Sequence, residues 1–358
     1  MLIGVVRETA PHERRVALVP QSVERLTAGG HAIVVEACAG LAAGFPDQAY
    51  TGAGARIADR SVVLGESDLV LTVQCPQPDD LRLTRTGTVV IGLVGSRREA
   101  LAGAAAARNL ILLAMELVPR VTKAQVMDVL SSQATIAGYQ AVLLGASHLA
   151  RLLPMLTTAA GTIPPGKAFI IGAGVAGLQA IATARRLGAV VSAFDVRPAV
   201  REQVKSLGAT FVETDAVSAA AEGAGGYARE LAADQQQAVL QTVARHLPDM
   251  DLVIATAQIP GKPAPRLITR SMVASMKPGS VIVDLAVESG GNCEASRSGE
   301  TIVESGITIL GPLNLPSQIP QHASVMYSRN VQALVDYGVR EGRFVADRDE
   351  PILGPMRI

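Results

Sequence analysis

One stretch of the sequence limits the possible folds more than any other. An apolar run at residues 168–171 leads into Gly172, Gly174 and Gly177, a helix-forming stretch follows, and a second apolar run ends at Asp195. In a strand–turn–helix unit the first glycine permits a tight turn, the second lets the backbone approach a pyrophosphate, and the third lets the helix pack closely on the strand. The pattern therefore predicts a dinucleotide-binding unit.

The helix after the glycines and the acidic residue beyond it define the ligand further. A helix N-terminus offers unpaired N–H groups and partial positive charge to phosphates. Asp195 stands where the fingerprint expects a carboxylate, ~20 residues on, and would accept hydrogen bonds from the adenosine ribose and repel a 2′-phosphate. We therefore expect NAD(H) rather than NADP(H). The alternative, a glycine-rich turn without a ligand, leaves the position of that carboxylate unexplained.

The composition favours a soluble chain with two domains. At ~150 residues per domain, 358 residues suggest two domains, and 49% hydrophobic residues can fill two cores. A net charge of +0 without a basic block argues against nucleic acid or an anionic membrane surface as a partner. The cysteines Cys38, Cys75 and Cys293 have no metal-ligand spacing and fit a reducing compartment. Without a signal peptide or an apolar stretch of ~20 residues, we expect a cytoplasmic chain that does not itself cross a membrane and holds no metal.

Apolar runs alternate with helical patterns along the chain, which is typical of parallel sheets covered by helices. The first array of predicted strands covers residues 3–6, 32–36, 69–73, 89–94 and 110–115, and the second covers 168–171, 190–194, 210–212, 252–255, 281–285 and 307–310. Six strands suit one Rossmann-type domain. We therefore predict an α/β fold with two Rossmann-like, doubly wound parallel-sheet domains and a nucleotide cleft between them. The first array lacks a glycine fingerprint, so its sheet is expected to be a scaffold.

Two helical segments set the expected domain boundaries. Residues 123–153 are compatible with a long helix, broken only by Gly138 and Gly145 and ending at Pro154, which we interpret as the connector between the domains. Residues 323–338 resume a helical pattern that a completed six-stranded domain does not need, so we expect them to pack on the first domain. The predicted N-terminal Rossmann-like (flavodoxin-like) domain is residues 1–135 plus 322–358, and the predicted NAD(H)-binding Rossmann domain is residues 136–321.

Motifs throughout the chain match one known family. They lie at residues 7–20, 120–133, 154–161, 172–177, 195–197, 225–227, 260–265 and 276–286. On these motifs the chain resembles the NAD(H)-binding component, called domain I, of proton-translocating nicotinamide nucleotide transhydrogenase, in the alanine dehydrogenase/transhydrogenase family. The resemblance implies a Re/Si-specific NAD(P)+ transhydrogenase, in which hydride passes directly between NADH on this chain and NADP+ on a partner subunit, coupled to proton translocation.

The resemblance also assigns residues around the nicotinamide. The matching positions are Arg120, Gln125, Asp128 and Ser131. Gln125 and Asp128 would hold the carboxamide and ribose, Ser131 would add a hydrogen bond, and Arg120 would contact the nucleotide near the reacting ring. On a helix, residues spaced by three occupy neighbouring sides of one face, so we expect Gln125, Asp128 and Ser131 to converge on the cleft. Helix capping with a solvated face is the alternative interpretation.

The expected cofactor-binding residues of the second domain lie in four places along the chain. They are Gly172, Gly174, Val175 and Gly177, then Asp195, Val196 and Arg197, then Gly226 and Tyr227, and finally Thr256, Ala257 and Gln258. With Asp195 present, Arg197 is expected to stack on the adenine or contact a phosphate rather than bind a 2′-phosphate.

The last two groups rest on different arguments. By resemblance, Tyr227 belongs to a mobile loop and folds over the bound nucleotide, and the Ala/Gln-rich composition as far as Gln237 favours such a loop. A loop tyrosine that packs on a neighbour is the alternative. The group from Thr256 to Gln258 follows the fourth strand of the second array, at the carboxyl edge where open sheets bind ligands.

Alanine dehydrogenases share the N-terminal motif and the fingerprint. Arg15 matches their substrate-carboxylate arginine, but Gln74 stands where they carry a lysine, and Gly95-Ser96 where they carry a histidine. A 2-oxo acid needs an acid/base group as well as a cation, so an alanine dehydrogenase-like, NAD-dependent amino-acid dehydrogenase is the weaker hypothesis. An NAD(H)-sensing protein that has lost its hydride acceptor is a further alternative.

The chain carries one dinucleotide fingerprint, so NADP(H) must be bound elsewhere. The resemblance implies an NADP(H)-binding subunit and a membrane-embedded proton-channel subunit as partners, and a homodimer of this chain. It places the chain at the cytoplasmic face of the membrane, held there by those partners.

Overall fold

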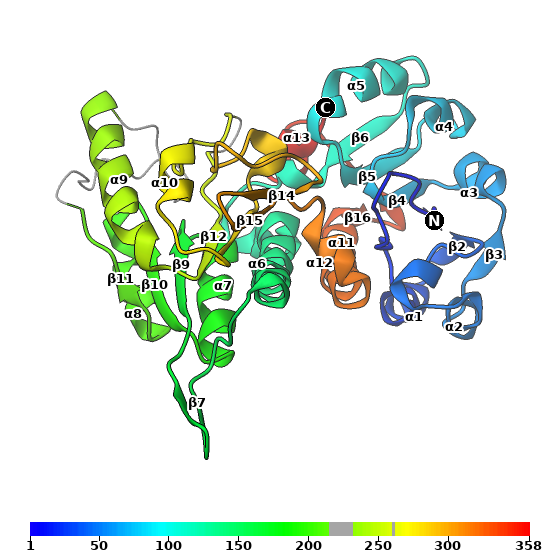
Figure 1. Ribbon diagram of the computed structural model, residues 1–358. Coiled ribbons are helices and arrows are strands. Elements are labelled where there is room, and N and C mark those ends of the chain that lie inside the picture. The colour runs from blue at the N-terminus through cyan, green and yellow to red at the C-terminus, as the bar shows by residue number, and fades with distance from the viewer. Residues whose placement is uncertain (215–231, 260–261) are drawn as a thin grey trace. The chain divides into compact units, whose positions relative to one another are not determined.

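The computed structural model describes residues 1–214, 232–259 and 262–358 (Figure 1). The chain forms two compact units, one of Met1–Gln133 with Pro316–Ile358 and one of Ala134–Leu315. Two predicted site residues, Gly226 and Tyr227, lie outside the described residues. Within the described ranges, no helix is both long and apolar enough to span a bilayer.

The first unit contains a six-stranded parallel sheet in the order β3-β2-β1-β4-β5-β6. Its strands are β1 (Leu2–Val5), β2 (Ala32–Glu36), β3 (Arg56–Ala58), β4 (Leu69–Gln74), β5 (Val89–Leu93) and β6 (Ile111–Ala114). Its first helices are α1 (Pro20–Ala28), α2 (Asp47–Gly52), α3 (Arg60–Glu66), α4 (Pro78–Leu83) and α5 (Arg98–Ala106). All predicted strands of this array are confirmed within a residue at each end. The sequence analysis missed β3, because this short edge strand contains no apolar run.

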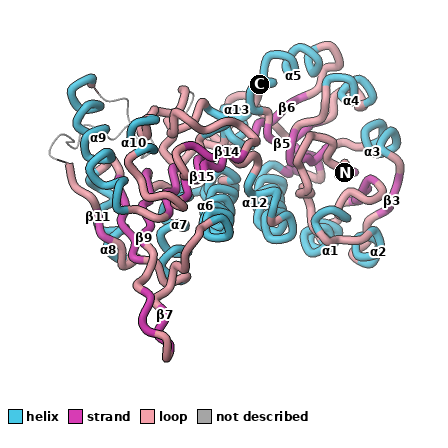
Figure 2. The backbone as a smooth tube through the Cα atoms, in the orientation of Figure 1, coloured by secondary structure: helices cyan, strands magenta, loops and turns pink. Residues whose placement is uncertain are grey.

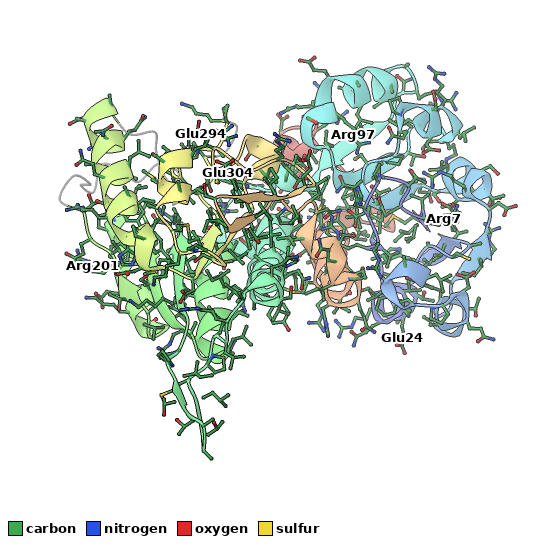
Figure 3. The ribbon with its side chains drawn as sticks, viewed as in Figure 1. Arg7, Glu24, Arg97, Arg201, Glu294 and Glu304 are labelled. Atoms are coloured by element: carbon green, nitrogen blue, oxygen red, sulfur yellow. The ribbon has the colours of Figure 1, made fainter. Side chains whose placement is uncertain are left out.

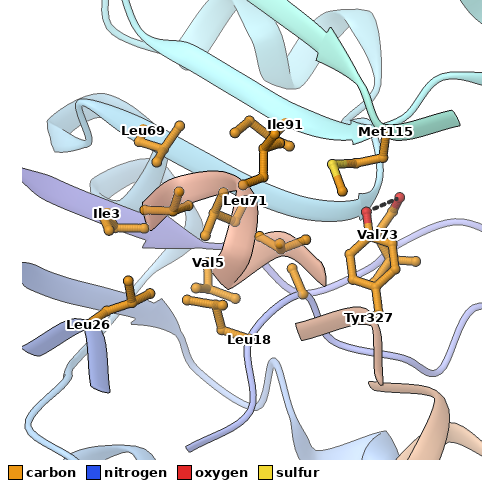
Figure 4. Close-up of a cluster of buried hydrophobic side chains, with 14 of the residues drawn as sticks. Ile3, Val5, Leu18, Leu26, Leu69, Leu71, Val73, Ile91, Met115 and Tyr327 are labelled. Carbon is orange, nitrogen blue, oxygen red and sulfur yellow. Dashed lines mark hydrogen bonds between the residues drawn. The ribbon is translucent and has the colours of Figure 1, made fainter. Parts of the chain in front are cut away.

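Helix α12 (Pro320–Gly338) packs on the first unit's sheet, as its pattern predicted. Val331, Leu334 and Val335 join the buried cluster that contains the strand residues Ile3 and Val5. Figure 4 shows Tyr327 in the same cluster, where its hydroxyl donates to the carbonyls of residues 72 and 73 at 2.8 and 3.3 Å. The C-terminal segment therefore completes the N-terminal core.

The second unit contains a seven-stranded sheet in the order β11-β10-β9-β12-β13-β15-β14, which is parallel except at β14. Its strands are β9 (Lys167–Ile171), β10 (Val190–Phe194), β11 (Thr210–Phe211), β12 (Leu252–Ala255), β13 (Val281–Asp284), β14 (Thr301–Glu304) and β15 (Ile307–Leu310). Its helices include α7 (Val175–Arg186), α8 (Arg201–Ser206), α9 (Ala233–His246) and α10 (Arg270–Ala274). The six predicted strands are confirmed, and the doubly wound α/β architecture follows in both units.

Strand β14 is an addition that the alternation of strands and helices did not predict. It pairs antiparallel with β15 across a turn in which Ser305 and Gly306 both have positive φ, 54° and 76°. Such primed turns suit tight hairpins. Glu304 pairs with Arg270, whose backbone N–H also donates to Glu294 at 3.0 Å. Figure 3 labels the two acidic partners, Glu294 and Glu304. The edge of the sheet is therefore tied to α10.

The predicted single helix over residues 123–153 is wrong. A short 3-10 helix, η4 (Thr122–Met127), comes first, and α6 (Val129–His148) begins two residues later. Helix α6 is labelled in Figure 2. Gly138 lies inside α6, where a Cβ would come 2.0 Å from the carbonyl oxygen of Ala176. This glycine allows α6 to pack tightly on the first turn of α7. Beyond α6, the chain forms an exposed antiparallel hairpin of β7 (Leu156–Thr158) and β8 (Gly161–Ile163).

The part of the expected loop before residue 232 lies outside the described residues, whereas Ala233 to Gln237, also expected in that loop, begin α9. Its alanine and glutamine residues are good helix formers, and this propensity outweighs the loop expectation. The remaining short elements are η1 (Leu41–Ala43), η2 (Gly95–Arg97), η3 (Met115–Leu117), η5 (Pro198–Val200), η8 (Leu247–Asp249), η9 (Val287–Ser289), α11 (Leu315–Gln318), β16 (Val339–Arg340), β17 (Arg343–Phe344) and α13 (Leu353–Met356).

Candidate nucleotide site

The turn between β9 and α7 requires glycine at two of its three glycine positions. Gly172 has a φ of 95°, and a Cβ there would lie 2.7 Å from Oγ1 of Thr256. A Cβ on Gly177 would lie 1.8 Å from the carbonyl oxygen of Gly172, so any side chain would push the helix off the strand. These are the turn and close-packing roles that the fingerprint assigns to its first and third glycines.

The second glycine borders open space. A Cβ built on Gly174 meets no atom within 4 Å, although Gly174 directly precedes the first turn of α7. The next residue, Val175, is 40% exposed. The first N–H groups of a helix have no partner within the helix, and they attract anions. The turn therefore has both the room and the donors that a pyrophosphate needs.

Asp195 follows β10 and lies beside this turn. Its carboxylate is buried and accepts the N–H of Ala173 at 2.7 Å and the N–H of Arg197 at 2.8 Å. The guanidinium of Arg197 adds two further bonds, from Nε at 2.9 Å and from Nη2 at 2.8 Å. Each carboxylate oxygen thus accepts two hydrogen bonds, which fills the usual capacity of the group.

The neighbour of these residues, Val196, has a different environment. Its side chain packs against the buried cluster that contains Phe169 and Phe194. This packing leaves Val196 half-buried.

The turn after β12 is held by hydrogen bonds to other parts of the second unit. The Thr256 hydroxyl donates to the carbonyl of Gly172 at 3.0 Å, which joins this turn to the fingerprint. Ala257 donates its N–H to Oδ1 of Asn292 at 3.0 Å and accepts Nδ2 of the same side chain at 2.8 Å. Gln258 is exposed, and its amide reaches the Leu285 carbonyl at 3.5 Å. Of the three residues, Gln258 is exposed, whereas Thr256 and Ala257 are half-buried.

The sequence analysis missed Asn292, because it lies 35 positions from Ala257. The signal that could have drawn attention to it is the pair of glycines before it. Gly290 and Gly291 have φ values of 107° and 84°, so the chain turns sharply just ahead of Asn292.

The residues predicted around the nicotinamide belong to the first unit and do not share one helix. Gln125 lies in η4, whereas Asp128 has φ −73° and ψ 91° and precedes α6. Asp128 caps this helix, because Oδ1 accepts the Ser131 N–H at 2.9 Å and Oδ2 accepts the Ser131 hydroxyl at 2.6 Å. Arg120 and Gln125 are exposed. The structure thus brings Asp128 and Ser131 into contact by capping, not by a shared helical face.

Helix α12 fixes the position of η4. The Nδ2 of Asn330 donates to the carbonyl of Val126 at 2.7 Å, next to Gln125. Gln133 lies on the first turns of α6. Its Nε2 donates to the carbonyl of Ala323 at 3.2 Å, and its Oε1 accepts a hydrogen bond from Nη1 of Arg15 at 2.8 Å. The segment from Gln125 to Gln133 is therefore attached to the core of the first unit at both ends.

The side chain of Arg15 forms hydrogen bonds with buried groups of the first unit. Its Nε and Nη2 donate to Glu13 at 2.7 and 2.6 Å in a buried pair, and Gln74 donates to the same carboxylate at 3.2 Å. Burial opposes the charge, but the hydrogen bonds and charge of Glu13 raise the pKa of Arg15. Nearby, burial raises the pKa of Glu8 to about 8, against two backbone hydrogen bonds from residues 73 and 74 that lower it.

A contact like that of Asp195 recurs in the first unit. Glu36, the last residue of β2, accepts the N–H of Arg7 at 2.8 Å, just as Asp195 accepts that of Ala173. Here the carboxylate also pairs with Arg60 at 2.8 Å, and Arg60 pairs with Asp80 at 2.7 Å. No comparable glycine turn precedes Arg7.

These features define a Rossmann-type α/β protein whose second unit carries a glycine turn of the kind typical of dinucleotide-binding units. Two family models match the chain, "Alanine dehydrogenase/PNT, N-terminal domain" over residues 4–137 and "Alanine dehydrogenase/PNT, C-terminal domain" over residues 141–357. The chain belongs to the alanine dehydrogenase/PNT family.

Three relatives indicate where in this family the chain lies. It is 40% identical to NAD(P) transhydrogenase subunit alpha of Haemophilus influenzae, over 99% of this chain and 69% of that one. A transhydrogenase structure from Sinorhizobium meliloti matches with a TM-score of 0.90 and 44% identity, over 100% of this chain and 98% of the other. Alanine dehydrogenase 2 of Staphylococcus aureus (strain USA300) is 30% identical, over 91% of this chain and 84% of its own length. The chain is therefore more similar to the transhydrogenase proteins than to this alanine dehydrogenase.

Proposed function

We propose that the chain is the NAD(H)-binding subunit of a proton-translocating, Re/Si-specific NAD(P)+ transhydrogenase. The observation that carries the proposal is the turn of Gly172, Gly174 and Gly177 with Asp195 beside it, in a chain so similar to the transhydrogenase alpha subunits. A carboxylate at this position favours the free ribose hydroxyls of NAD(H) over the 2′-phosphate of NADP(H).

The chain's own groups would bind and orient rather than exchange protons. Bound NADH supplies the hydride, and Arg120, Gln125, Asp128 and Ser131 contact its nicotinamide half, by resemblance to the family. Holding reactants in place can lower a barrier by ~7–11 kcal/mol at best. Gln74, which stands where alanine dehydrogenases carry a lysine, donates to Glu13 and offers no titrating group. Positioning alone therefore accounts for the catalytic contribution of this subunit.

The proposal includes partners. NADP(H) is bound by another subunit, and a membrane-embedded subunit conducts protons, so this chain lies at the cytoplasmic face of the membrane through its partners. A homodimer is supported by the β7–β8 hairpin, where Leu156 and Ile163 are 42% and 48% exposed and the adjoining Met155 is 64% exposed. Exposed apolar groups gathered on one hairpin are typical of a surface that another chain covers.

The test is hydride transfer from NADPH to an NAD analogue, with the purified chain added to a transhydrogenase NADP(H)-binding subunit. Activity that neither component has alone is expected. Proven NADH binding without transfer would favour the NAD(H)-sensing alternative. NADH oxidation that depends on ammonia and a 2-oxo acid would instead identify an amino-acid dehydrogenase.

A further inference from the structure

Asn292 connects three segments of the second unit. It is fully buried, and its side chain makes both hydrogen bonds to Ala257 and a third, through Nδ2, to the carbonyl of Pro265 at 2.9 Å. Its own carbonyl accepts the N–H groups of Leu267 and Ile268 at 2.9 and 3.0 Å. One residue therefore fixes the turn after β12 against the segment that leads into α10.

The chemistry of these partners demands an amide. Ala257 presents one N–H donor, and Ala257 and Pro265 together present two carbonyl acceptors. An asparagine side chain has one oxygen and one NH2 group, so it can satisfy all three at once. A carboxylate of the same shape would face two carbonyl oxygens with no proton to offer.

Asn292 is itself held from behind. Asp284, at the end of β13, accepts the Cys293 N–H at 2.9 Å and the Ser296 hydroxyl at 2.6 Å. A Cβ on Gly291 would lie 2.8 Å from Oδ2 of Asp284, so the chain needs glycine there to reach this arrangement. The hydrogen bonds of Asp284 therefore hold the backbone next to Asn292 in place, so that the amide of Asn292 faces Ala257.

The sheet order determines which half of a dinucleotide meets this turn. The strands run β10-β9-β12, with the pyrophosphate-binding turn after the central strand β9 and Asp195 after β10. A dinucleotide with its adenosine ribose at Asp195 and its phosphates at the β9 turn extends toward β12. The turn from Thr256 to Gln258 therefore borders the nicotinamide half.

We propose that Asn292 is a positioning residue for the nicotinamide half of the bound cofactor, acting by fixing both backbone polar groups of Ala257. The inference rests on the proposed function, because it takes the turn after β12 as part of the NAD(H) site. Asn292 occupies the N–H of Ala257 and one of the two lone pairs of its carbonyl oxygen, so the turn meets the nucleotide through its shape, through Gln258 and through the remaining lone pair.

The test compares two ligands on Asn292→Asp. NADH affinity is measured by the fluorescence of the bound cofactor, and ADP, which has the adenosine and two phosphates but no nicotinamide, is measured by calorimetry. We expect NADH to bind at least tenfold more weakly and ADP to bind within about twofold of the wild type. Equal losses for both ligands, or no loss for either, would overturn the proposal.

A matched control is Ser280→Ala. Ser280 is also buried and donates to a backbone carbonyl, that of Met250 at 3.0 Å, but it precedes β13 at the opposite edge of the sheet. It should lower stability without changing the ratio of NADH to ADP affinity. Should Asn292→Asp fail to fold, Asn292→Ser, which keeps a small donor and acceptor, is compared in the same way. Wild-type chain that binds no NADH would refute the proposed function instead.

Discussion

The guanidinium of Arg197 covers the carboxylate of Asp195, two residues earlier in the chain, through two side-chain hydrogen bonds of 2.9 and 2.8 Å. With two backbone N–H groups on the same carboxylate, no acceptor position is left for a ribose hydroxyl. Nucleotide binding through Asp195 therefore requires Arg197 to move aside. The pair also neutralises the charge that would repel a 2′-phosphate.

Replacing Arg197 by alanine should free Asp195 for the ribose and leave its charge uncompensated. We expect NADH affinity to stay equal or rise several-fold, and the preference for NADH over NADPH to increase. Equilibrium titrations with both nucleotides measure this. Arg201→Ala is the control, because Arg201 begins α8 and pairs with Glu213 at 3.0 Å. A tenfold loss of NADH affinity would show that Arg197 contacts the nucleotide directly.

Replacing Asp195 by alanine should weaken NADH by about tenfold, as expected for the loss of hydrogen bonds to a charged group, and strengthen NADPH, because Arg197 is released. Asp251→Ala controls for the loss of a buried carboxylate. Asp251 accepts the Lys167 N–H at 2.7 Å and pairs with Arg151 at 2.9 Å. It directly precedes β12, at the amino ends of the strands and so away from Asp195. The Asp251→Ala variant should be less stable, but its preference for NADH over NADPH should not change. Unchanged selectivity in the Asp195 variant would refute our argument for the cofactor.

Asp128 offers a way to separate a structural role from a ligand role. Asp128→Asn keeps an oxygen for the Ser131 N–H, whereas Asp128→Ala removes the cap of α6 at a cost of about 1 kcal/mol. If the carboxylate holds the nicotinamide ribose, Asp128→Asn should reduce hydride transfer more than tenfold while the melting temperature stays near that of the wild type. A normal rate in Asp128→Asn would mean that Asp128 only caps the helix.

The Glu8 carboxyl predicts a pH dependence of stability. Its pKa in the folded chain is about 8, against an ordinary value of 4.5, chiefly because burial raises it. The folded state then binds the extra proton, so this contribution is complete below pH 4.5 and is lost as the pH rises through 8. The melting temperature should therefore fall over this range, by about 2–4 °C for each kcal/mol lost.

Removing the titrating group should flatten that profile. Glu8→Gln keeps one oxygen acceptor for the N–H groups of Val73 and Gln74 but cannot ionise. The exposed Glu24 on α1 serves as the control, through Glu24→Gln. A Glu8→Gln profile as steep as that of the wild type would contradict the assignment, whatever the absolute stability of the variant.

The sequence predicts the second unit's fingerprint well because its elements are local. The apolar run of β9, the glycines of the turn and the start of α7 are adjacent in the chain, and each residue type has one structural use there. The break at Asp128 was not predicted, since residues 122–127 are compatible with a helix and propensity is a weak guide against packing. The bond from Asn330 to Val126, formed across 204 positions, explains why the local preference fails.

Side-chain partners were less predictable than elements. Arg197 was expected on the adenine or a phosphate, because sequence shows what a side chain can bind but not which partner lies nearest. The role of Asn292 depends on backbone groups of Ala257 and Pro265, which no pattern of residue types marks. Such contacts form only in the folded chain, where turns that are distant in the sequence come together at the carboxyl ends of the strands.

The contact of Glu36 with Arg7 has a consequence for stoichiometry. Both units place a carboxylate at the end of the second strand of equivalent sheets, Glu36 as the last residue of β2 and Asp195 just after β10, and bond it to a backbone N–H just past the first strand. In the first unit Arg60 also joins Glu36 to Asp80, and no glycine turn makes room for phosphates. Among the described residues, only the second unit's sheet has such a glycine turn, so we expect a titration with NADH to saturate at one molecule per chain.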